Sequence, residues 1–141
     1  MMDSHLQSYI NALIENRAVS ATDIETLNHT LFPKGIRSKA EADALIAVDR
    51  LIQPQDEWSY TVTALVVDFV LSGERRKGAV SSETAHWLVA TLDVGELTKT
   101  AIWIAEEVVK QADVVDPVLV DFMLRRVRYY PKARYSERNA A

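Results

Sequence analysis

Two carboxylate side chains lie inside stretches of the sequence that are otherwise apolar. Asp68 is the second residue of Val67-Asp-Phe-Val-Leu71, and Asp121 is the second residue of the similar pentad Val120-Asp-Phe-Met-Leu124. A pair of buried carboxylates could hold a divalent cation or have raised pKa values, because burial disfavours the charged form. Alternatively, each carboxylate faces solvent, caps a neighbouring helix or pairs with an arginine. The apolar spacing around them favours this second interpretation.

The C-terminal end of the chain is basic and aromatic. Residues 125–138 carry six basic side chains and one acid. Arginine with tyrosine suits contact with an acidic protein partner or with nucleic-acid phosphates. The alternative is a helix whose basic last turn complements the helix dipole, followed by a soluble tail. In the first interpretation, the partner-binding residues would be Arg125, Arg126, Arg128, Tyr129, Tyr130 and Arg134.

Motifs for most other kinds of chemistry are missing from the sequence. It contains no cysteine, which excludes disulfides and thiolate metal sites. His5, His29 and His86 show no paired spacing of the kind that zinc sites use. There is also no Gly-rich phosphate loop and no Gly-x-Ser-x-Gly motif. We therefore expect neither an enzyme nor a bound cofactor.

The bulk composition is typical of one globular domain. The chain has 141 residues, of which 48% are hydrophobic and 26% charged, and its net charge is −4. An acidic body argues against nucleic-acid binding except through the basic tail. The N-terminus lacks the pattern of a signal peptide, and the apolar stretch 62–71 is too short to span a membrane. We expect a cytoplasmic protein that makes no membrane contact.

Helix-start residues and apolar spacing together predict an all-α fold. Ser or Thr stands before four of the apolar-periodic segments, and Asp116-Pro117 stands before another. The few glycines and prolines favour long helices. The predicted helices cover residues 4–16, 20–31, 38–52, 55–72, 81–92, 98–112 and 116–128. They would form a single bundle-like domain over residues 1–128, followed by a basic, flexible tail over 129–141.

One loop form, Gly-x-apolar-Ser/Thr, recurs along the chain. Glycine permits a positive φ, the apolar residue anchors the loop to the core, and the hydroxyl caps the next helix. Two such loops could lie side by side and exchange backbone hydrogen bonds. A shift of 61 residues aligns Val19-Ser20 with Val80-Ser81, which predicts two similar three-helix halves, 4–52 and 55–112, plus a C-terminal helix. The four loops are Arg17-Ala-Val-Ser20, Gly35-Ile-Arg-Ser38, Gly78-Ala-Val-Ser81 and Gly95-Glu-Leu-Thr98.

These loops carry two family resemblances. They resemble the second half of an EF-hand calcium loop, but residues such as Arg75 and Leu92 occupy the ligand positions, so calcium binding is not expected. With seven helices in two similar halves, the segments Gly35-Ile-Arg-Ser-Lys-Ala-Glu41 and Gly78-Ala-Val-Ser-Ser-Glu83 resemble the TerB-like tellurite-resistance superfamily. That resemblance implies a helical fold and acidic residues associated with metal. Lys34 and Lys77 stand where that family typically has an acid.

Two functions follow as alternatives from these observations. The first is a non-enzymatic interaction or scaffold module that binds an unknown protein partner and could form a homodimer. The second is a TerB-like metal- or stress-response protein that binds a divalent cation through acids such as Asp68 and Asp121. The aromatic residues Trp58, Trp87 and Trp103 are expected in the core in either case.

Overall fold

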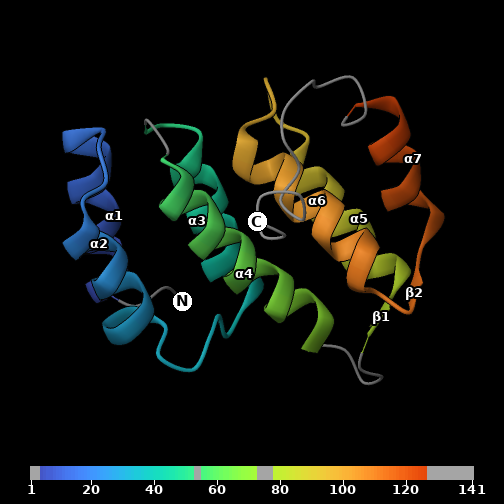
Figure 1. Cartoon of the computed structure of the whole chain (residues 1–141), viewed down its shortest axis with the longest axis horizontal. Helices are drawn as coiled ribbons and strands as arrows, with labels where there is room; N and C mark the ends of the chain where they lie inside the picture. The colour runs from blue at the N-terminus through green and yellow to red at the C-terminus, as the bar shows by residue number, and fades with distance from the viewer. Residues whose placement is uncertain (1–3, 53–54, 73–77, 127–141) are drawn as a thin grey trace.

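The computed structural model describes residues 4–52, 55–72 and 78–126. In these ranges the predicted all-α fold is confirmed, and the helices match the predicted ranges to within about three residues (Figure 1). A capping side chain precedes five of the α-helices, namely α2, α3, α5, α6 and α7. One further helical segment continues directly from α2. The α-helices are α1 Ser4–Asn16, α2 Ala21–Glu25, α3 Lys39–Asp49, α4 Asp56–Ser72, α5 Ser82–Leu92, α6 Lys99–Gln111 and α7 Pro117–Arg125.

Two elements of the fold were not predicted. The helix α2 continues directly as a π-helix, η1 Thr26–Leu31, so the predicted helix over 20–31 changes its winding halfway. Two short strands, β1 Ala79–Val80 and β2 Val114–Val115, pair in parallel. Because each strand directly precedes a helix, the pair holds the start of α5 beside the start of α7.

The first position of each recurring loop has a positive φ, as predicted. The φ angles of Gly35, Gly78 and Gly95 are +90°, +81° and +62°. Arg17 takes the place of glycine in the first loop and has φ +54°, the one positive value at a non-glycine residue in the described chain. The loop shape is therefore imposed even where a side chain opposes it.

The other two loop positions also behave as predicted. The capping hydroxyls each accept a hydrogen bond from the backbone N–H three residues further on. The apolar anchors are all buried, and Ile36 stands one position earlier in its loop than the other three. The caps are Ser20, Ser38, Ser81 and Thr98, and the anchors are Val19, Ile36, Val80 and Leu97. Each recurring loop is thus a helix start that is fastened to the core.

The backbone pairing of these loops differs from the prediction. The Gly78 loop pairs with the segment before α7 rather than with another recurring loop. Asp113 N donates to the Gly78 carbonyl oxygen at 2.8 Å. A Cβ at Gly78 would lie 2.6 Å from Asp113 Oδ2, so this close approach requires glycine.

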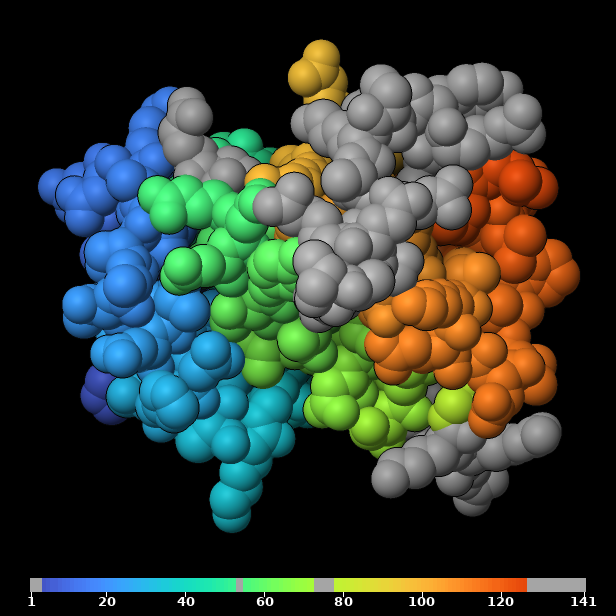
Figure 2. All heavy atoms as spheres, viewed as in Figure 1, coloured from blue at the N-terminus to red at the C-terminus, as the bar shows by residue number. Residues whose placement is uncertain are grey.

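The helices α4 and α6 pack along each other at the centre of the molecule (Figure 1). The N-terminal helices lie at one end and α7 at the other, and the space-filling view shows the same order from blue to red (Figure 2). Trp58 and Trp103 are fully buried and Trp87 is half-buried. None of the helices in the described ranges combines the length and apolarity that a membrane span requires.

The predicted internal repeat has two structural counterparts. The 61-residue shift places α2 with η1, residues 21–31, onto α5, residues 82–92, and it places α3, residues 39–49, within α6, residues 99–111. The segments of the first pair also begin after equivalent caps, Ser20 and Ser81. The duplication itself stays a prediction.

Candidate functional site

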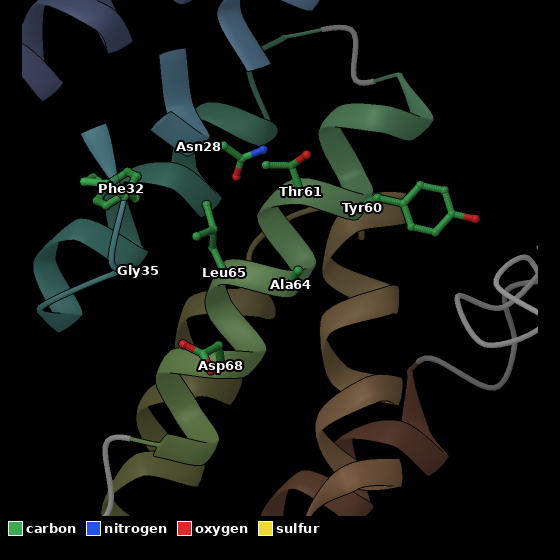
Figure 3. Close-up of a pocket in the computed structure, with 9 residues that line it drawn as sticks. Asn28, Phe32, Gly35, Tyr60, Thr61, Ala64, Leu65 and Asp68 are labelled. Atoms are coloured by element: carbon green, nitrogen blue, oxygen red, sulfur yellow. The ribbon is translucent and has the colours of Figure 1, made fainter. Parts of the chain in front are cut away.

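An open groove of about 660 Å³ runs along α4, which we call the α4 groove (Figure 3). Its far wall comes from η1 and from the loop that leads to α3. Asn28 and Thr61 lie at one end, and Asp68 lies at the other, near the backbone of Gly35 (Figure 3). The lining residues are Asn28, Phe32, Pro33, Gly35, Tyr60, Thr61, Ala64, Leu65 and Asp68.

A second hollow of about 290 Å³ adjoins this groove on the side of α6. Ala64 and Asp68 are exposed on α4 and line both hollows, so they lie between them. We call the second hollow the acidic pocket because two carboxylates line it. Its residues are Thr63, Ala64, Val67, Asp68, Leu71 and Ser72 of α4 and Glu107 and Gln111 of α6.

The polar groups of the acidic pocket are incompletely bonded. The exposed Asp68 accepts one hydrogen bond, from Ser72 Oγ at 3.3 Å. Glu107 is 7% exposed and accepts one from Gln111 Nε2 at 2.6 Å. Thr63 is fully buried, and its Oγ1 has no hydrogen-bond partner in the described chain. No Lys or Arg among the described residues forms an ion pair with either carboxylate.

A second polar cluster joins α3, α4 and the start of α6, and we call it the Asp49 cluster. The Asp49 carboxylate is 2% exposed and accepts from Trp58 Nε1 at 2.9 Å, Thr100 Oγ1 at 2.6 Å and Thr98 Oγ1 at 2.5 Å. Ser59 Oγ lies 2.8 Å from Thr100 Oγ1. Burial raises the pKa of the Asp49 carboxyl, because desolvation outweighs these hydrogen bonds and the nearby Arg50 charge.

Another aspartate of α3 has a similar structural role. Asp43 accepts from Trp87 Nε1 at 3.0 Å and from Thr91 Oγ1 at 2.8 Å, which joins α3 to α5. Lys39 lies over the Trp87 ring, 5.7 Å from its centroid. Asp43 and Asp49 thus supply the acceptors that partly and fully buried indole N–H groups need. We assign both aspartates to the architecture of the fold.

The structure separates the two predicted carboxylates. Asp68 belongs to α4, whereas Asp121 is exposed on α7 and accepts a hydrogen bond from Arg125 Nε at 2.9 Å. The helix α4 packs on α6, and α7 packs mainly on α5 (Figure 1). No group of three or more His, Asp or Glu side chains suited to a metal ion occurs in the part of the chain that the structure describes. The divalent-cation alternative stays a prediction.

The six predicted partner-binding residues at the C-terminal end divide into two sets. Arg125 pairs with Asp121. Arg126 Nη2 donates to the Gly95 carbonyl oxygen at 2.9 Å, and Arg126 Nε lies 3.0 Å from Asp93 Oδ1. These arginines fasten the end of α7 within the molecule. The remaining four, Arg128, Tyr129, Tyr130 and Arg134, lie outside the described residues.

The sequence interpretation missed four polar residues of the acidic pocket. They lie within predicted helices, but none belongs to the apolar stripes that defined those helices; they are Thr63, Ser72, Glu107 and Gln111. The one indirect signal was the broad apolar arc of α4, because a helix with such an arc packs against more than one neighbour. When α6 packs against this arc of α4, a polar residue of α6 that faces α4, such as Glu107, becomes buried.

A comparison of the chain with protein-family models, curated proteins and solved structures finds no match.

Proposed function

We propose that the chain is a non-enzymatic interaction module that binds a segment of a partner protein in the α4 groove. The groove carries this proposal because it is open along α4 from Thr61 to Asp68, and its lining mixes apolar and polar side chains. Small-molecule sites are usually enclosed around their ligand, whereas an open groove suits an extended or helical segment. A TerB-like relationship, as the recurring loops suggest, is compatible with such a role.

The chemistry of the lining indicates what the segment carries. Phe32, Pro33 and Leu65 offer apolar contact, and Asn28 and Thr61 offer hydrogen bonds. The charge in the lining is negative and comes from Asp68, and Glu107 lies just beyond it in the acidic pocket. Complementary charge steers and orients association. The bound segment therefore presents apolar side chains and at least one basic residue.

Site-specific photo-crosslinking tests this proposal and identifies the partner in the same experiment. A photoreactive amino acid replaces Ala64, which is exposed and lines the groove. The matched control replaces Ala90, which is equally exposed but belongs to α5. After irradiation in the cells that make the protein, mass spectrometry should identify an adduct that forms at position 64 and not at position 90. No adduct at position 64, or the same adducts at both positions, would contradict the proposal.

A groove-filling variant provides a second readout. Ala64→Arg introduces a long side chain at an exposed position, so the free energy of unfolding should change by no more than about 0.5 kcal/mol. Capture of the partner identified by crosslinking should then fall at least about tenfold, because the added bulk occupies its site. Ala90→Arg should leave capture unchanged. Unaltered capture by Ala64→Arg would place the partner elsewhere, for example on the basic tail.

A further inference from the structure

We propose that the acidic pocket binds one cationic side chain of the lysine or arginine type. This inference rests on the proposed function, because a segment in the α4 groove would bring such a side chain to Asp68, which lines both hollows. Three independent observations support it: the unpaired charge of the pocket, its unpartnered buried hydroxyl, and its apolar walls.

The charge argument comes from two buried glutamates of this chain. Glu41 is 6% exposed, and it accepts hydrogen bonds from the guanidinium and from the backbone N–H of Arg37, each at 2.8 Å. Glu107 is buried to the same degree, but its described partner is the neutral amide of Gln111. A buried carboxylate is costly unless a cation or several donors satisfy it. A cation from outside would give Glu107 what Arg37 gives Glu41.

The hydroxyl of Thr63 supplies the second observation. This residue is fully buried and lines the pocket, yet its Oγ1 has no hydrogen-bond partner in the described chain. Such an orphan group costs stability, and the large majority of buried polar groups have a partner. An ammonium or guanidinium carries several N–H donors, so one cation in the pocket can donate to more than one of these acceptors.

The walls of the pocket favour an organic cation over a metal ion. Ala64, Val67 and Leu71 line it with apolar surface, which suits the aliphatic stem of a lysine or arginine. A calcium ion takes six to eight oxygen ligands, usually with several carboxylates. Asp68 and Glu107 supply two carboxylates, and the described ranges hold no group of three. The volume of about 290 Å³ accommodates one such side chain.

The test uses two small probes on the full chain, N-acetyl-lysine methylamide and ethylguanidinium. We expect saturable amide chemical-shift changes in nuclear magnetic resonance, centred on residues 63–72 of α4 and 107–111 of α6. Glu107→Gln and Asp68→Asn should each weaken probe binding at least about tenfold, because each removes a charged hydrogen-bond acceptor. Two variants keep the test informative, since Asp68 is exposed and its replacement does not disturb the core.

Asp121→Asn is the matched control. Asp121 is an exposed aspartate in an equivalent pentad on α7, so its replacement should leave probe binding unchanged. Equal weakening by Asp121→Asn, absence of saturable shifts, or equal shifts with the uncharged probe N-acetyl-norleucine methylamide would overturn the proposal. Tighter binding of calcium than of either probe would overturn it too.

A further variant identifies where the cation comes from. Residues 127–141 carry four basic side chains, and replacing all four by glutamine leaves the sequence of the described helices unchanged. Tighter probe binding to this variant would show that the tail itself competes for the pocket. Unchanged binding would show that the tail does not occupy the pocket. If crosslinking at position 64 succeeds but Glu107→Gln leaves probe binding intact, the pocket proposal fails while the proposed function stands.

Discussion

Two polar clusters connect α4 with α6, one at each end of α6, and they differ in how completely their groups are bonded. In the Asp49 cluster, at the start of α6, one carboxylate receives three donors from Trp58, Thr98 and Thr100. In the acidic pocket, near the end of α6, two carboxylates share no described cation and the Thr63 hydroxyl has no described partner. The Asp49 cluster is buried and its polar groups have hydrogen-bond partners. The acidic pocket opens to solvent, and its polar groups are incompletely bonded.

This difference separates architecture from recognition. Buried polar groups that satisfy one another stabilise a fold and help to specify it. Groups left without partners cost stability, and a protein retains them where a ligand provides what is missing. The contact between α4 and α6 therefore has a stabilising hydrogen-bond cluster at one end and a candidate binding site at the other. Four sets of measurements test this difference between the two clusters.

Removal of the Asp49 carboxylate should have the largest effect. Asp49→Ala leaves the Trp58 indole and two threonine hydroxyls without their acceptor in the interior. We expect the free energy of unfolding to fall by about 3–5 kcal/mol in urea denaturation. Asp121→Ala, at an exposed position, should change it by less than about 0.5 kcal/mol. A loss below about 1 kcal/mol for Asp49→Ala would mean that the cluster is not a stabilising joint.

A matched pair of threonines should give effects of opposite sign. Thr100 and Thr63 are both buried, but only Thr100 has described hydrogen-bond partners. Thr100→Val should lower the free energy of unfolding by about 1–2 kcal/mol, whereas Thr63→Val should raise it by up to about 1 kcal/mol. Chemical denaturation of both variants under one set of conditions makes the comparison. Equal losses would show that Thr63 also has a partner in solution.

The pH dependence of stability should report the burial of Asp49. The pKa of Asp49 is raised in the folded protein above its unfolded value of about 3.9. Between these two pKa values, the folded state therefore binds more protons than the unfolded state. The stability that this group contributes is fully present below the unfolded pKa and is lost as pH rises through the folded pKa. Asp49→Asn lacks this titration, so its deficit relative to the wild type should shrink between about pH 4 and neutrality. A deficit that grows with pH would contradict the raised pKa.

Neutralisation of Glu107 should have the smallest effect on stability. Glu107→Gln keeps the shape of the side chain and removes a buried charge that has no described cation. The free energy of unfolding should stay within about 0.5 kcal/mol of the wild type or rise slightly. Glu41→Gln is the control, and it should lose about 1–3 kcal/mol because Arg37 loses its charged partner. A loss for Glu107→Gln as large as for Glu41→Gln would remove the distinction between the two sites.

Much of the local structure could be predicted from the sequence. Ser20, Ser38, Ser81 and Thr98 mark helix starts because a cap bonds to a backbone N–H only three residues away. The π-helical turn of η1 and the pairing of β1 with β2 could not be predicted in this way. Both depend on packing between segments that the sequence pattern does not connect, as the contact of Gly78 with Asp113 shows.

The candidate site shows the same division between local and long-range determinants. Asp68 stood out because its neighbours along the chain are apolar, and the structure places it in the lining of two hollows. The similar pentad of Asp121 did not reveal that this aspartate is exposed and pairs with Arg125. Glu107 and Thr63 had no local signal, because their importance comes from facing the same pocket. The helices, their caps and the loop shapes depend on interactions within a few residues, so they could be predicted from the sequence. Which polar groups meet depends on the packing of α3, α4 and α6, because burial and pairing arise only when these helices come together.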